Sequence, residues 1–125
     1  MKRGEIYLVN LPESGRSIQS KLRPAIVISN DLANKYSPVI HVCPISSKSN
    51  KNNLPTHVEL STRCGLITIS TALCEQSMLI SKDVFIKKIG QCDNLTMLRI
   101  DDALKIQFGL TKQNNPVNDL QLAYA

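Results

Sequence analysis

The stretch Lys21-Leu22-Arg23-Pro24-Ala25-Ile26-Val27-Ile28-Ser29-Asn30 joins a cationic segment to a run of apolar residues. Residues 25–28 are continuously apolar and rich in β-branched side chains, which is typical of a buried strand. Proline cannot donate to a sheet ladder and often stands at the first residue of a strand. Pro24 therefore predicts the start of a strand, with Arg23 at its mouth. A guanidinium there stays charged and suits phosphate, and the alternative interpretation is a rim arginine paired with a carboxylate.

Length and charge limit what the chain can be. Its 125 residues suffice for one domain with one core. Lys and Arg number 15 against 10 Asp and Glu, and the net charge of +5 modestly favours a polyanionic partner. No apolar run approaches the roughly 20 residues of a membrane span, and no signal-peptide block follows the first residues. A soluble, cytoplasmic protein with no membrane partner is expected.

The four cysteines, Cys43, Cys64, Cys74 and Cys92, are widely spaced, and none forms a Cys-x-x-Cys pair. Such spacing does not favour a zinc site or a redox motif. Cys43 and Cys74 lie in apolar runs, where a free thiol behaves as a small hydrophobe. Buried reduced thiols, with no metal and no cofactor, are therefore predicted.

Several short apolar segments separated by turn residues predict a sheet. Strands are expected over residues 4–11, 25–28, 39–45, 56–60, 66–73 and 84–90. Residues 30–38 hold turn formers and one possible helical turn, and Pro44 indicates a bulge or a sheet edge. Asp93 can cap a helix, and apolar residues then recur at helical spacing as far as Leu110. The sequence thus predicts a mainly β protein with helices (α+β), a twisted, partly closed antiparallel β-barrel with a C-terminal helix.

Polar segments lie beside the predicted strand ends. Residues 13–22 form a long loop that carries Arg16 and Lys21, and residues 46–53 form a second loop that carries Lys48. Long loops in small domains are more often functional than idle. Residues 1–110 are expected to form the single domain, and residues 111–125 a tail that is flexible or docked on a partner.

Three polar groups adjoin strand ends: Arg23 before residue 25, Ser46 after residue 45, and Glu75-Gln76 after residue 73. Strand ends distant in sequence can converge. A hydroxyl and a guanidinium facing one phosphodiester would hold it and stabilise charge on its nonbridging oxygens. With RNA the nucleophile can be the substrate's own 2'-hydroxyl, so such a site needs no metal and no catalytic triad.

Four motifs occur in order: Gly4-Glu5-Ile6-Tyr7, the segment Arg23 to Asp31, Leu54-Pro55-Thr56-His57-Val58-Glu59, and Gly65 followed by Leu73-Cys74-Glu75-Gln76. Together they resemble the MazF/PemK family of toxin endoribonucleases, over about residues 2–110. The resemblance implies a CcdB-like barrel, a homodimer, and metal-independent, sequence-specific cleavage of single-stranded messenger RNA. It also implies 2',3'-cyclic phosphate and 5'-hydroxyl ends, and a cognate antitoxin peptide that blocks the RNA groove.

The resemblance assigns catalysis to Arg23 and Ser46. Arg23 would stabilise the pentacovalent phosphate and Ser46 would position the phosphate or the 2'-hydroxyl. Other candidates for RNA binding are Arg16, Gln19, Lys21, Ser47, Lys48 and Gln76. The first loop departs from the family's Gly-Ser-Glu-Gln, since Ile18 replaces the acid, and Met78 replaces a basic residue. These departures affect the expected cleavage sequence more than the reaction.

Three further residues have structural alternatives. His41, in the middle of a strand, is expected to be a core or interface histidine. His57 is a possible supporting residue that is more readily explained by local hydrogen bonding. Glu75 is either a supporting residue of the site or a buried ion partner of Arg23.

Two other function classes fit the same residues. A CcdB-like toxin that binds a protein such as gyrase, without nuclease activity, is the main alternative. An RNA-binding barrel without turnover is the other. Cleavage of labelled RNA in EDTA separates both from a nuclease.

Overall fold

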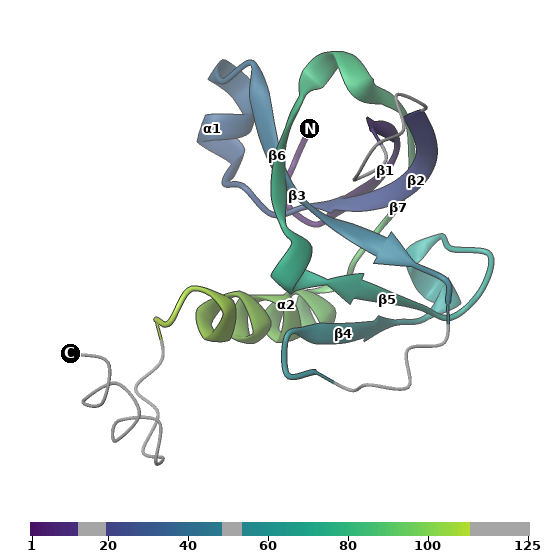
Figure 1. Ribbon diagram of the computed structural model, residues 1–125, viewed down its shortest axis with the longest axis vertical. Coiled ribbons are helices and arrows are strands. Elements are labelled where there is room, and N and C mark those ends of the chain that lie inside the picture. Colours follow the sequence, from purple (N-terminus) through teal and green to yellow (C-terminus); the bar gives the residue numbers. More distant parts are fainter. Residues whose placement is uncertain (13–19, 49–53, 111–125) are drawn as a thin grey trace.

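The computed structural model describes residues 1–12, 20–48 and 54–110 (Figure 1). The strands are β1 (Glu5–Pro12), β2 (Ser20–Val27), β3 (Val39–Ser46), β4 (His57–Leu60), β5 (Ser70–Leu73), β6 (Met78–Ser81) and β7 (Phe85–Gln91). The α-helices are α1 (Asp31–Tyr36) and α2 (Asn94–Gln107), and short 3-10 turns are η1 (Thr62–Cys64), η2 (Cys74–Gln76) and η3 (Lys82–Val84).

The seven strands of the described ranges form one twisted antiparallel sheet in the order β4-β5-β3-β2-β1-β7, with β6 also paired to β3. β3 is the central strand. Its first half pairs with β6 and its middle with β2, and its last two residues pair with β5. Figure 1 shows the sheet curling around its interior, with α2 beside β4 and β5. The predicted partly closed antiparallel barrel with a C-terminal helix is confirmed.

Alternation along β1 and β2 divides the core into two clusters. Ile6 and Ile26 belong to a cluster that also holds residues from β3, β4, β5 and α2. Val9 and Ala25 face the opposite way, into a smaller cluster with residues of β3 and β6. Because both faces of β1 and β2 are covered, the strands carry apolar residues on both sides.

Helix α2 begins where the sequence predicts. The Asp93 carboxylate accepts a hydrogen bond from the Thr96 N–H at 2.7 Å, which satisfies one free donor of the first turn. Ile100 and Ala103 are fully buried against the larger cluster, and Met97 packs beside them. The face predicted from Met97 and Ile100 is therefore the buried one.

The prediction for the opening stretch is wrong in one respect. β2 begins at Ser20, so Pro24 and Arg23 lie inside the strand, where Pro24 is opposite Leu8 and Arg23 is opposite Val9. Pro24 is tolerated because the β2–β3 register ends one residue away, at Ala25 opposite Pro44. Pro44 consequently marks the end of a ladder within a central strand, and not a sheet edge.

Two other strands differ from prediction. Residues 66–69 are not in a strand, so β5 covers only the last part of the predicted segment 66–73. β6 was not predicted, because its four residues show no alternation and only Ile80 is buried. The one helical turn predicted within residues 30–38 is α1, and the strands at residues 4–11, 39–45, 56–60 and 84–90 are confirmed within one or two residues at each end.

All four cysteines are buried free thiols, as expected. A hydrogen bond with Cys74 is the largest cause that raises the pKa of the Cys43 thiol, and burial raises it further. For the Cys92 thiol, burial is the largest cause of the raised pKa. His41 is half-buried, edge-on to Phe108 with ring centroids 6.4 Å apart.

None of the helices in the described ranges has the length and apolarity that a bilayer-crossing helix needs.

Candidate active site

A small cleft opens where β2 and β3 separate. The two strands are paired only as far as Ala25 opposite Pro44; beyond this point β3 turns to β5, with Ile45 opposite Ala72. The cleft has a volume of about 140 Å³ and is lined by residues 21–24 of β2 and by residues 45–48, at the end of β3 and just beyond it. It is therefore a fixed gap between two strands that are anchored in the core, and such sites position side chains more accurately than loops do.

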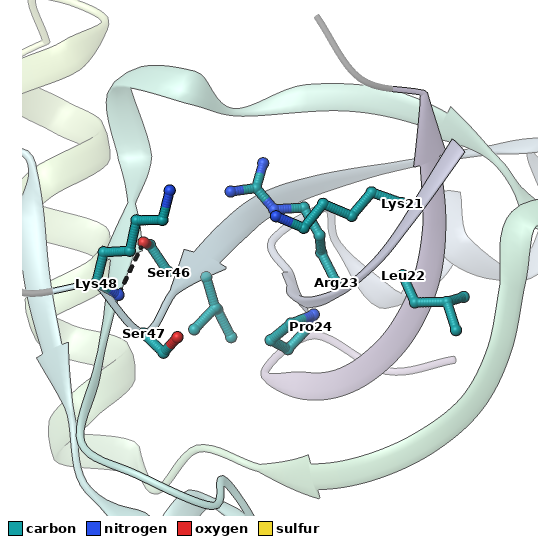
Figure 2. A pocket seen from close by; sticks show the side chains of 8 residues that line it. Lys21, Leu22, Arg23, Pro24, Ser46, Ser47 and Lys48 are labelled. Atoms are coloured by element: carbon teal, nitrogen blue, oxygen red, sulfur yellow. Dashed lines mark hydrogen bonds between the residues drawn. The ribbon is translucent and has the colours of Figure 1, made fainter. Parts of the chain in front are cut away.

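Three cations line this cleft. Lys21 and Arg23 lie two residues apart on β2 and therefore share a face of the strand. Figure 2 shows the charged ends of Lys21 and Arg23 directed toward the side of the cleft that holds Ser46 and Lys48. The part of the lining that the structure describes contains no carboxylate, and none of the three cations forms an ion pair with a described residue. The rim ion pair considered for Arg23 is thus absent from these ranges.

Ser46 supplies the hydroxyl. It is the last residue of β3 and only 9% exposed. Its Oγ accepts a hydrogen bond from the Lys48 N–H at 3.2 Å (Figure 2), which fixes the oxygen while leaving its own hydrogen free to donate. Ser47 follows at an exposed position and also lines the cleft.

The cleft is suited to an anion with several oxygens. A guanidinium offers five donors in one plane, two ammonium groups add charge, and a serine hydroxyl donates from the opposite wall. Donors fixed in advance around a small concave site stabilise charge that develops on a bound phosphate without reorganising. The described residues contain no group of three or more His, Cys, Asp or Glu side chains that could hold a metal ion.

Glu75 is not the ion partner of Arg23, which corrects that prediction. It accepts a hydrogen bond from Thr56 Oγ1 at 2.8 Å and lies 2.9 Å from His57 Nε2. Burial, the largest single influence, would raise the pKa of Glu75. The hydrogen bonds from its own backbone N–H, Thr56 and His57 outweigh that influence and hold this pKa below its ordinary value.

The Glu75 carboxylate connects two elements of the fold. It ties β4 to η2, together with the Cys74 N–H that donates to the Thr56 carbonyl at 3.1 Å. His57 Nδ1 is buried with no hydrogen-bond partner among the described atoms, which favours the tautomer that carries its hydrogen on Nε2 and donates to Glu75. The side-chain hydrogen bond of His57 is therefore made with Glu75, 18 residues along the chain, and not with a local partner.

The remaining predicted site residues are divided. Arg23, Ser46, Lys21, Ser47 and Lys48 come together in the cleft. His57, Glu75 and the exposed Gln76 do not line it, and Arg16 and Gln19 lie outside the described residues.

The sequence prediction missed the walls of the cleft. Pro24 and Ile45 form much of its apolar side, although Pro24 was assigned only to the start of a strand. The sequence offers one signal for these walls: Pro24 and Pro44 each stand in an apolar, strand-like run. Because proline removes a donor from a ladder, each marks a point where strand pairing can stop. Without the register, however, nothing in the sequence places them side by side.

Comparison with known proteins identifies relatives of the chain. A model of the PemK-like, MazF-like toxins of type II toxin-antitoxin systems matches residues 2–108. The chain is 38% identical to Endoribonuclease EndoA of Bacillus subtilis over 111 residues, covering 88% of this chain and 96% of that protein. It is 35% identical to Endoribonuclease MazF of Staphylococcus saprophyticus, covering 88% and 92%.

Solved structures share the fold. The Mycobacterium tuberculosis toxin MazF-mt6 superposes with a TM-score of 0.74 at 19% identity, covering 86% of this chain and 99% of that one. An endoribonuclease from a mycobacterial species, solved in complex with its cognate antitoxin, gives 0.74 at 19% identity, covering 90% and 99%. The match of the family model over most of the sequence, together with these identities, shows that the chain belongs to the PemK-like, MazF-like toxins of type II toxin-antitoxin systems.

Proposed function

We propose that this MazF-like toxin endoribonuclease cuts single-stranded messenger RNA at short sequences by metal-independent transesterification, with Arg23 and Ser46 as its catalytic residues. The observation that carries the proposal is the cleft in which the Arg23 guanidinium faces the Ser46 hydroxyl, with Lys21 and Lys48 beside them. Among the described residues, its lining has three positive charges and no carboxylate, so a phosphodiester is the complementary ligand.

The scissile phosphate would lie between the two strands. Arg23 donates to its nonbridging oxygens, and the Ser46 hydroxyl donates from the other wall. Lys21 and Lys48 add attraction to the scissile and neighbouring phosphates, which depends strongly on salt. Since Ser46 Oγ accepts from the Lys48 N–H, its own hydrogen is free to donate to a phosphate oxygen.

The reaction is an in-line displacement on RNA. The 2'-oxygen forms a bond to phosphorus, and the bond from phosphorus to the 5'-oxygen of the next nucleotide breaks. The 2'-hydroxyl loses its proton to water, and the departing 5'-oxygen takes a proton from water. The products are a 2',3'-cyclic phosphate and a 5'-hydroxyl.

Arg23 acts by electrostatic stabilisation in this scheme. A guanidinium remains protonated at neutral pH and is a poor base. Negative charge grows on the nonbridging oxygens as phosphorus becomes five-coordinate, and a donor fixed against that charge contributes about 10²–10³-fold in rate.

Two protein partners belong to the proposal. A cognate antitoxin peptide would inhibit the toxin by covering the cleft; the mycobacterial endoribonuclease solved with its antitoxin and the MazE-MazF complex of Deinococcus radiodurans support this. A homodimer is also proposed. Exposed apolar side chains on one face of the sheet and the end of α2, among them Leu79 and Phe108, are available for such an interface.

The test is cleavage of end-labelled single-stranded RNA in EDTA. The unmodified protein should produce fragments with 2',3'-cyclic phosphate and 5'-hydroxyl ends. Arg23→Ala should reduce the rate about 100-fold or more, and Arg99→Ala, which removes an exposed arginine from α2, should not. Intact RNA that is retained on the protein at low salt indicates binding without turnover, and intact RNA with no retention favours a toxin that acts by protein binding.

A further inference from the structure

A second, larger cavity adjoins the cleft. Its volume is about 520 Å³, within the range of small-molecule sites. Pro24 and Ser47 line both spaces, so the two lie next to each other at these residues. In Figure 2 the Ser47 side chain points away from the Arg23 guanidinium. A ligand held by its phosphate in the cleft can therefore extend into the cavity.

One wall of the cavity is a row of side chains across three strands. Leu8 of β1 lies opposite Pro24 of β2 on one side and opposite Lys87 of β7 on the other. With neighbouring strands about 4.8 Å apart, the row from Pro24 to Lys87 spans about 10 Å. Leu8 and Pro24 continue the apolar face that Ile6 and Ile26 begin in the core.

The facing wall is the segment of residues 65–70, held against β7 by close backbone packing. Gly65 has a φ of +95°, and a Cβ there would lie 2.3 Å from the Ile89 carbonyl oxygen. A Cβ at Gly90 would lie 1.7 Å from the Cys64 carbonyl oxygen. Two glycines thus permit a contact that fixes Leu66, Ile67 and Thr68 over the cavity.

The chemistry of the lining suits a nucleobase. Most of the lining is aliphatic, and Leu8, Leu66 and Ile89 can pack on the faces of a flat ring. The polar groups are few: the hydroxyls of Ser47, Thr68 and Ser70, and the Lys87 ammonium. Ser70 already donates to the Thr68 carbonyl at 2.9 Å, and Lys87 forms no ion pair with a described residue.

We infer that this cavity binds the base of a nucleotide adjoining the scissile phosphate, and that Lys87 makes it discriminate against adenine. The inference rests on the proposed function for the identity of the ligand in the cleft. An ammonium only donates hydrogen bonds. Guanine, uracil and cytosine each have an exocyclic carbonyl oxygen that accepts from it, whereas adenine offers ring nitrogens as its only acceptors and carries an amino group, a donor, in place of a carbonyl.

The test is an NMR titration of the full chain, labelled with ¹⁵N, with the four nucleoside 3'-monophosphates, the four 5'-monophosphates and inorganic phosphate. Phosphate alone should shift the amide signals of Ser46, Ser47 and Lys48. Nucleotides of at least one series should also shift those of Leu66, Thr68 and Ile89, with adenosine about tenfold weaker than guanosine or uridine. Cavity signals that respond no more to nucleotides than to phosphate would overturn the inference. A cavity filled by a side chain of a second copy of the chain would give that result.

Variants test the role of each wall. Lys87→Met should abolish the discrimination against adenosine, whereas Lys105→Met on α2 should preserve it. Ile67 is 99% exposed, so Ile67→Trp should fold and should weaken nucleotide binding about tenfold without changing phosphate binding. Ile69→Trp is the control, because Ile69 is exposed in the same segment and does not line the cavity.

These readouts are independent of catalysis. Selective nucleotide binding in a protein that cuts no RNA would overturn the proposed reaction and leave the base site standing. Cleavage with an unresponsive cavity would overturn the base site and leave the reaction standing. Adenosine binding equal to that of the other nucleosides would refute the role of Lys87.

Discussion

Replacing Gly90 by alanine should destabilise the protein far more than a typical Gly→Ala change. The new Cβ would lie 1.7 Å from the Cys64 carbonyl oxygen, 2.7 Å from its carbon and 3.0 Å from the Gly65 Cα. Bringing the closest contact to 3.0 Å requires a shift of at least 3.0 − 1.7 = 1.3 Å. All three atoms belong to the backbone, so no side-chain rotation relieves the clash.

The cost follows from what must move. η1 carries Cys64, which is buried with Cys92 in the larger core cluster, so a shift of η1 disturbs packing there. Severe overpacking with backbone displacement costs about 3–4 kcal/mol. Gly109→Ala is the matched control: its φ of +68° strains alanine, but no atom lies within 4 Å of the added Cβ, so about 1 kcal/mol is expected.

Urea unfolding at fixed protein concentration measures both changes, because a homodimer would make stability depend on concentration. The free energy of unfolding should fall about 2–3 kcal/mol further for Gly90→Ala than for Gly109→Ala. Equal losses within about 0.5 kcal/mol would show that the close contact between η1 and β7 is not rigid, and would refute the reasoning.

Two further predictions concern stability. Asp93→Ala should lower the free energy of unfolding by about 1 kcal/mol, measured by the same assay, because the Thr96 N–H loses its acceptor; no change would mean that the carboxylate does not cap α2. Glu75→Gln should cost about 1–2 kcal/mol at pH 7, since Thr56 and His57 lose a charged partner. Because the pKa of Glu75 is lowered on folding, its stabilisation is complete above its ordinary value of 4.5 and is lost as pH falls through the lower folded value. The difference between the parent and Glu75→Gln should therefore shrink in acid, and a difference that grows below pH 4.5 would contradict the assigned direction.

Much of the fold could be predicted because period and capping are local properties. The side chains of residues 4–11 point alternately to two apolar faces, which predicts β1. Apolar residues at helical spacing after Asp93 predict α2. Neither depends on knowing which strands are neighbours. β6 could not be predicted, because its four residues owe their strand to pairing with β3 and show no pattern of their own.

The candidate site was predicted only in part, for a related reason. Arg23 and Ser46 both line the cleft, but only Ser46 does so from the end of a strand, because Arg23 lies within β2. What joins them is the separation of β2 from β3 after Ala25 and Pro44, a matter of register. Like Ser46, Glu75 adjoins a strand end in the sequence. The pairing of β4 with β5, however, places it beside His57 and not in the cleft.

The cavity beside the cleft was outside the reach of sequence analysis. Residues 66–69 alternate as a strand would, but the contact of Gly65 with Gly90 holds them as an irregular wall. Lys87 faces that wall only through its register with Leu8. Neither the Gly65–Gly90 contact nor the register of Lys87 with Leu8 can be predicted from a periodicity in the sequence.

The most direct test of the central claim is the rate of RNA cleavage by Arg23→Ala, Ser46→Ala and the double variant, in EDTA with single-stranded RNA. If both side chains act on one phosphate, each single change should lower the rate, Arg23→Ala about 100-fold or more. The double variant should then lose less than the product of the two single effects, because residues that act as a unit are not additive. Cleavage by Arg23→Ala at the rate of the parent protein, with the same cyclic phosphate ends, would contradict the claim.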